Sequence, residues 1–213
     1  MNEYSIWYWE KKLEFVKRNL EKNRFTVYLT DNTNSVPDII FSLLKPEDSI
    51  GLGGSLTLTE LNIPFFLKEK NFNVINFPDK TLAREIVLEQ RRQSLLSDAY
   101  LTSTNSITED GLLVNIDCYS NRIAAMMFGP KKVLIIAGIN KIVKDADAAV
   151  WKIKHYTAPQ NCKRLNRNAP CVKTGDCSDC QTESRICCNT SIMGYQSIPG
   201  RIHIIIVKDN LGI

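Results

Sequence analysis

Apolar residues recur along the chain with two different spacings, which predicts helices and strands in alternation. Trp7, Leu13, Val16 and Leu20 are separated by charged residues at roughly helical spacing, so residues 4–23 are expected to form an amphipathic helix. Short apolar runs predict strands at 25–29, 49–52, 73–77, 98–102, 112–116, 133–137 and 201–207. Further helices are expected at 38–44, from about 55 onward, and at 81–96, 121–128 and 142–155.

This alternation predicts an α/β fold: a doubly wound, mostly parallel sheet with helices on both faces. The run 133–137 is apolar at every position, as in a strand buried on both faces. Pro64 is expected to kink or interrupt its helix, and Thr81 to cap the next one. No repeat or linker is visible. We therefore expect one domain over residues 1–213, with a cysteine-rich loop at 160–200 inserted before the last strand.

Charge and hydropathy exclude several classes of protein. The net charge of +4 arises from scattered lysines and arginines, so no nucleic-acid-binding tract is expected. Glu10, Lys11, Lys12 and Glu14 interrupt the apolar residues near the N-terminus, which argues against a signal peptide. No apolar run approaches the roughly 20 residues that a membrane-spanning helix needs. The sequence therefore predicts a cytoplasmic protein without a membrane span.

Five of the seven cysteines lie between residues 171 and 188. Cys171, Cys177, Cys180 and Cys187 follow the spacing C-x5-C-x2-C-x6-C, and two thiolates separated by two residues can converge on one metal ion. In a reducing compartment, such clustering favours metal-binding or redox chemistry over a disulfide framework. The predicted metal ligands are these four thiols.

The identity of the bound group is left open between several alternatives. A single C-x2-C pair with looser flanking spacings favours an iron–sulfur cluster of the [4Fe–4S] type. Structural zinc is the first alternative, and reduced thiols or a redox disulfide the second. Cys188 is an alternative to Cys187 as fourth ligand, whereas Cys118 and Cys162 are interpreted as structural or incidental thiols.

A glycine-rich turn follows the predicted strand 49–52 and opens the next helix. Backbone N–H groups and hydroxyls in such a turn favour an anion. The turn lacks the Gly-Lys-Ser/Thr of a Walker A loop and the third glycine of the dinucleotide fingerprint. A tight turn with a capped helix explains the spacing equally well. The candidate ligand-binding residues are Gly53, Gly54, Ser55 and Thr57.

Polar turns rich in hydrogen-bond donors follow three later strands. Open α/β sheets bind ligands at the carboxyl ends of their strands, so these turns and the glycine turn together predict an anion- or phosphate-binding cleft. The candidate residues are Thr104, Asn105, Thr108, Glu109, Asp110, Asn115, Asn121, Arg122, Gly138, Asn140 and Lys141. No catalytic residue is assigned. Glu109 and Asp110 are adjacent and would point apart, and His155 and His203 are interpreted as structural.

These motifs together resemble the lactate-utilisation (LUD) domain family from about Tyr8 to the C-terminus. The resemblance is carried by the glycine turn at 51–57, by the stretches 104–115, 121–130 and 138–143, and by the segment that starts at Pro170-Cys171. It implies a fold like that of sugar-phosphate isomerases and CoA transferases, which bind phosphorylated or CoA-type ligands at strand ends. It also implies a link to L-lactate oxidation beside iron–sulfur partner proteins. Cys118-Tyr119 departs from the small turn expected there and would narrow the pocket.

Three functional hypotheses follow. The first is an accessory redox protein of L-lactate or related organic-acid oxidation, with a cysteine-ligated iron–sulfur cluster that passes electrons or docks a partner. The alternative is a sugar-phosphate or acyl-CoA binding enzyme of isomerase or transferase type, with a structural zinc loop. A zinc-stabilised regulatory domain is a third reading. Each includes an anionic small-molecule ligand, and a homo-oligomer is compatible with all three.

Overall fold

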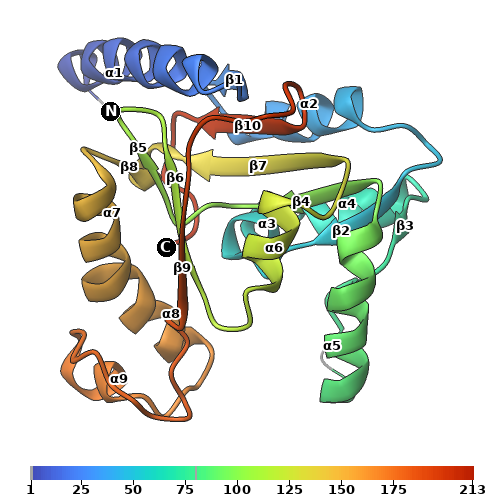
Figure 1. The fold of residues 1–213 in the computed structure, drawn as a ribbon. Coiled ribbons are helices and arrows are strands. Elements are labelled where there is room, and N and C mark those ends of the chain that lie inside the picture. Colours follow the sequence, from blue (N-terminus) through green and yellow to red (C-terminus); the bar gives the residue numbers. More distant parts are fainter. Residues whose placement is uncertain (1, 80) are drawn as a thin grey trace.

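Six parallel strands form the main sheet of the computed structural model, which describes residues 2–79 and 81–213. Every neighbouring pair of these strands is parallel, and Figure 1 shows their arrangement. In spatial order they are β1 (Thr26–Thr30), β10 (Ile202–Val207), β7 (Lys132–Gly138), β4 (Ala99–Thr102), β2 (Ser49–Leu52) and β3 (Asn73–Val74).

Helices cover both faces of this sheet, because successive strand residues point to opposite sides. In β7, Ile135 packs with Val16 and Leu20 of α1 (Glu3–Lys22), whereas Leu134 packs in the core of the opposite face. That second core is completed by α2 (Val36–Leu43), α3 (Leu56–Glu60) and α4 (Ile63–Glu69). The predicted doubly wound α/β fold with a mostly parallel sheet is confirmed.

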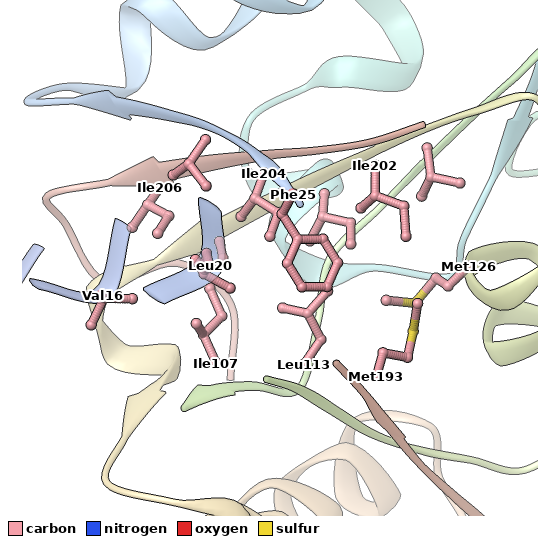
Figure 2. Packing of buried hydrophobic residues seen from close by; sticks show 14 of the residues in the cluster. Val16, Leu20, Phe25, Ile107, Leu113, Met126, Met193, Ile202, Ile204 and Ile206 are labelled. Atoms are coloured by element: carbon pink, nitrogen blue, oxygen red, sulfur yellow. The ribbon is translucent and has the colours of Figure 1, made fainter. Parts of the chain in front are cut away.

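A second sheet of four strands was not predicted. Its spatial order is β8 (Ile142–Val143), β5 (Ser106–Thr108), β6 (Leu113–Asp117) and β9 (Asn189–Met193). In Figure 2, side chains from α1 and β10 point toward Ile107 and Leu113 of this sheet. The core that contains Val16, Leu20 and Ile135 therefore lies between the two sheets. The strand expected at 112–116 therefore exists, but it belongs to the second sheet rather than the main one.

The remaining helices lie mostly after the first half of the chain. Ala149 and Ile153 pack against Val114 and Ile116 of the second sheet. None of the helices in the part of the chain that the structure describes is long and apolar enough to cross a membrane. The remaining helices are α5 (Arg84–Gln93), α6 (Asn121–Met127), α7 (Ala146–Lys152), a π-helical turn (Ile153–Thr157), α8 (Ala158–Arg164) and α9 (Pro170–Thr174). Short 3₁₀ turns lie at 33–35, 94–96 and 139–141.

The helix expected from about residue 55 is interrupted, as predicted: α3 ends at Glu60, and Pro64 lies in the first turn of α4, where its missing N–H is tolerated. Two other local expectations are corrected by the structure. Thr81 does not cap a helix: its N–H and hydroxyl donate to Asp79, and α5 begins at Arg84. The helix predicted at 142–155 begins at Ala146, because Ile142–Val143 pairs as β8.

Candidate functional site

A cavity of about 430 Å³ lies where the parallel strands β2 and β4 end. We call it the strand-end cavity. This is the edge at which open α/β sheets bind ligands. The segments that line it come from distant parts of the sequence. Three of them can be found in Figure 1, at the start of α3, at the start of α6 and along α8. The lining segments are 52–57, 76–79, 103–105, 116–122 and 153–167, with Lys141, Ile186, Cys187 and others.

The two glycines of the turn after β2 are required for different reasons. A Cβ at Gly53 would lie 2.3 Å from Oγ1 of Thr102, so any side chain at this position would collide with β4. Only glycine lets the turn pass so close to that strand. A Cβ at Gly54 would meet nothing within 4 Å, although Gly54 lines the strand-end cavity. Gly53 therefore shapes the turn, and Gly54 leaves room in the cavity.

The helix after this turn is too short to contribute a strong dipole. Ser55 accepts a hydrogen bond from Leu58 N (3.2 Å) as the N-cap, and α3 has only five residues. Thr57 is buried, and its hydroxyl donates to Ser103 Oγ at 3.5 Å. Both hydroxyls thus help to hold the turn, and attraction for an anion must come mainly from side-chain charges.

Arg122 is the centre of a buried polar network at one wall of the strand-end cavity. Its guanidinium donates to Asp117 Oδ1 (2.5 Å), Asn105 Oδ1 (2.8 Å) and Ser103 O (3.2 Å). It also donates to Oδ1 of Asn115, which is fully buried behind the cavity lining and accepts from Thr104 Oγ1 (3.1 Å). Arg122 therefore joins the turn after β4 to the end of β6, with its charge balanced by Asp117.

Lys141 lines the strand-end cavity and is buried, at 3% exposure. Burial lowers its pKa to about 8, and the positive charge of Lys152 lowers it further, whereas Glu60 opposes the shift. Its Nζ donates to the carbonyl oxygen of Ile213. With a pKa of about 8, the side chain is mostly charged at pH 7 and becomes mostly neutral as the pH rises above that value.

Positive charge exceeds negative charge around the strand-end cavity. Five cationic side chains line it, against two carboxylates, Asp79 and Asp117. The cations are Arg91, Arg122, Lys141, Arg164 and Arg167. Within the described residues, Arg91, Arg164 and Arg167 form no ion pair. These three arginines were not singled out from the sequence, because nothing in their local pattern distinguishes them from surface arginines.

The residues predicted to bind a ligand divide into those that line the strand-end cavity and those that do not. Gly53, Gly54, Ser55, Thr57, Thr104, Asn105, Asn121, Arg122 and Lys141 line it. Thr108, Glu109 and Asp110 lie instead in the hairpin that docks α1: Glu109 forms an ion pair with Lys12 at 2.8 Å, and its carbonyl accepts from Asn19 Nδ2 at 2.8 Å.

Gly138 and Asn140 also lie outside the cavity lining, where they hold the C-terminal segment. Asn140 donates to Leu211 O (3.2 Å) and accepts from Leu211 N (3.0 Å). A Cβ at Gly138 would lie 2.4 Å from Asp209 O, so only glycine allows this close approach. Both residues position the segment that ends at Ile213 beside Lys141.

The cysteine loop, residues 171–188, approaches the strand-end cavity through Cys187, which lines it. Burial raises the pKa of Cys187, and the neighbouring Cys177 and Cys180 thiols add to this, whereas Arg185 opposes it. Burial and a hydrogen bond with Cys171 raise the pKa of Cys162 to about 12. Cys162 of α8 therefore lies next to Cys171, one of the four predicted ligands, although its position in the sequence does not group it with them.

Arg185 organises the backbone of the cysteine loop. It donates to Cys187 O (2.8 Å) and Cys180 O (2.6 Å), and its guanidinium pairs with Asp179 at 3.0 Å. Asp179 N in turn donates to Cys177 Sγ at 3.4 Å. Over residues 2–79 and 81–213, no three His, Cys, Asp or Glu side chains converge as the ligands of one metal ion would.

The family model of the LUD domain matches residues 13–207 of this chain. The chain belongs to the LUD domain family. This family is linked to lactate utilisation, and the match spans both sheets and the cysteine loop. The resemblance noted in the glycine turn, the polar turns and the cysteine segment is confirmed at the level of the family.

A solved structure has the same fold. It is a DUF162 family protein from Deinococcus radiodurans, with a TM-score of 0.51 and 13% sequence identity, and the comparison covers 93% of this chain and 97% of that one. At this identity the similarity concerns the fold alone. The comparison with curated proteins gave no match.

Proposed function

We propose that this LUD protein is an accessory redox protein of L-lactate or related organic-acid oxidation. In this proposal the strand-end cavity binds an anionic small molecule, and the cysteine loop holds an iron–sulfur cluster of the [4Fe–4S] type beside it. The protein would exchange electrons with iron–sulfur partner proteins. The family supports the general link to lactate utilisation. The remaining parts rest on the arrangement of charges and thiols.

The anionic nature of the ligand is supported by the charge of the strand-end cavity. Arg122 is neutralised by Asp117, but Arg91, Arg164 and Arg167 carry no ion-pair partner within the described residues. A carboxylate or phosphate would supply the missing negative charge, and guanidinium groups bind both through paired hydrogen bonds. The space left at Gly54 lets such a group approach the backbone.

The observation that carries the proposal is that the glycine turn and the cysteine loop share one cavity. Gly53, Gly54 and Cys187 all line it, although more than 130 residues separate the glycines from Cys187. An anion bound there would lie next to a thiol that belongs to the C-x2-C-containing set. Adjacency of this kind is what electron transfer between a bound organic acid and a metal centre requires.

The number and type of donors suit an iron–sulfur cluster, although no three of them converge within the described residues, so the proposal includes their convergence when the cluster binds. Cys171, Cys177, Cys180 and Cys187 supply four thiols, which is the number that such a cluster takes. Backbone N–H groups near the sulfurs, such as that of Asp179, are donors of the type that stabilises cluster sulfurs. When bound, the cluster would accept or donate single electrons. The same four thiols suit zinc, which would leave the loop with a structural role.

Metal content and colour test the cluster. Protein purified without oxygen is expected to be brown and to contain iron and acid-labile sulfide. Cys177→Ser and Cys180→Ser should lose both, whereas Cys118→Ser, which replaces a thiol outside the proposed ligand set, should keep them. Colourless protein with one equivalent of zinc would contradict the redox proposal and favour the structural alternative.

Ligand binding tests the strand-end cavity independently of the metal. Thermal-shift measurements with L-lactate, pyruvate, sugar phosphates and CoA thioesters are expected to reveal stabilisation by at least one of them. Gly54→Val should abolish this stabilisation because its side chain enters the cavity, whereas Gly54→Ala should largely retain it. No response from the wild type to any of these compounds would count against an anion site.

Lys141 favours the alternative function enough to keep it in view. A buried lysine whose pKa is lowered to about 8 can act as a base or a nucleophile, as isomerase- and transferase-type enzymes require. Turnover of a sugar phosphate or acyl-CoA that is lost in Lys141→Met, by protein whose metal is zinc, would favour that function over the redox one.

A further inference from the structure

Cys118 and Cys188 lie close to one another just past the end of the ladder between β6 and β9. These strands pair antiparallel from Leu113 opposite Met193 to Asp117 opposite Asn189. Cys118 and Cys188 are the residues directly beyond this last pair. The regular ladder ends there, and a hydrogen bond from Cys188 N to Asp117 O at 3.0 Å keeps Cys188 beside the residue that precedes Cys118.

This position suits a disulfide. A disulfide joins residues whose Cα atoms lie about 4.4–6.8 Å apart, so residues that flank the end of a strand pair can form one. Both sulfurs also lie 3.7 Å from the same atom, the carbonyl oxygen of Arg185. The two thiols therefore approach a common point.

A second cavity, of about 450 Å³, opens beside this pair. Cys118 and Cys188 both line it, and Cys118 lines the strand-end cavity as well. Three arginines surround the pair: Arg84, Arg167 and Arg185. Positive charge of this kind attracts a small anionic molecule to the pair. The surroundings therefore fit a low-molecular-weight thiol that carries carboxylates.

We propose that Cys118 and Cys188 form a reversible disulfide that exchanges electrons with an anionic low-molecular-weight disulfide of the glutathione type. This goes beyond the proposed function, because neither cysteine belongs to the four proposed cluster ligands. The pair would be a two-electron centre at the mouth of the strand-end cavity, separate from any metal.

The chemistry balances without any further reactant. Cys188 is exposed, so its thiolate attacks one sulfur of the small disulfide and releases the first small thiol. The half-buried Cys118 thiolate then attacks the Cys188 sulfur of this mixed disulfide and releases the second. Two protein thiols and one small disulfide become one protein disulfide and two small thiols. The two protons pass to the released thiolates.

Peptide mapping after oxidation tests the proposal on the full-length protein. Wild type incubated with oxidised glutathione and then alkylated should yield a linked peptide that joins Cys118 and Cys188. Cys118→Ser should instead accumulate a glutathione adduct on Cys188, because the resolving thiol is missing. Cys162→Ser is the matched control: it removes a cysteine from a second close pair, Cys162 and Cys171, and should leave the Cys118–Cys188 link unchanged.

Three outcomes would overturn the proposal: oxidised wild type with all thiols free, a link only between Cys162 and Cys171, or a link only between Cys187 and Cys188. Metal analysis of the same samples keeps the two proposals apart. Cys188→Ser should retain whatever metal the wild type holds, and loss of that metal, as in Cys177→Ser, would make Cys188 a ligand and exclude the disulfide. Colourless wild type that forms the Cys118–Cys188 link would contradict the cluster alone.

Discussion

At the scale of single residues, adjacent positions of one motif have different tasks. Gly53 and Gly54 both belong to the glycine turn, yet only at Gly53 would a side chain collide with β4. Arg122 and Arg164 both line the strand-end cavity, yet only Arg122 forms an ion pair with a described residue and is largely shielded from solvent. The sequence identifies the glycine turn and Arg122 as candidates, but it does not show which contacts each residue makes, since these depend on residues far along the chain.

Replacing each glycine by alanine distinguishes Gly53, which the shape of the turn requires, from Gly54, which leaves room in the cavity. Gly53→Ala is expected to lower the free energy of unfolding by about 1–3 kcal/mol, because the new methyl group overlaps Thr102. Gly54→Ala should leave stability within about 0.5 kcal/mol of the wild type, since its methyl group enters open space. Chemical denaturation measures both. Equal destabilisation by the two substitutions would mean that the turn does not pass as close to β4 as described.

Lys141 should make stability depend on pH in the alkaline range. Its pKa falls from 10.5 in the unfolded chain to about 8 in the folded protein, so between these values the unfolded state binds more protons and stability rises with pH. Below pH 8 the folded protein bears the full unfavourable effect of a buried charge. Lys141→Met should therefore be stabilised relative to wild type at pH 7 and lose that advantage toward pH 10. Parallel stability curves for the two proteins across this range would contradict the assignment.

At the scale of elements, the second sheet is what the sequence pattern did not reveal. Its strands are short, and β5 and β9 are rich in Ser, Thr and Asn, so neither shows the apolar run that predicts a strand. β8 has two residues, and the helix-like spacing that follows it concealed it. The sheet depends on pairing between residues about 75 positions apart, such as Asn115 and Ser191, which local periodicity does not encode.

The hydrogen bonds of Arg122 should be necessary for stable packing of the turn after β4 against the end of β6. Arg122→Met leaves Asp117 buried without its counter-charge, which is expected to lower the free energy of unfolding by about 3–5 kcal/mol. Arg164→Met removes a cation from the same cavity at an exposed position and should change stability by less than about 1 kcal/mol. Denaturation curves compare the two. Similar small effects would show that Arg122 does not hold the turn after β4 to β6.

At the scale of the whole molecule, the main sheet and the family were predictable from the sequence. The parallel strands are apolar runs separated by helices, and the motifs of the glycine turn and the polar turns are long and ordered. The grouping of Cys162 with the cysteine loop and the proximity of Cys118 to Cys188 were not predictable, because the fold brings them together from separate segments. The same folding places Cys187 and the glycine turn on one cavity.

The most direct test of this account asks whether the strand-end cavity and the cysteine loop act as one site. Protein purified without oxygen is titrated with L-lactate, pyruvate and inorganic phosphate while its visible absorption is recorded. The account predicts brown protein whose spectrum changes in a saturable way with at least one of these anions, and no such change in Gly54→Val. A colourless protein, or a cluster spectrum that no bound anion alters, would contradict it.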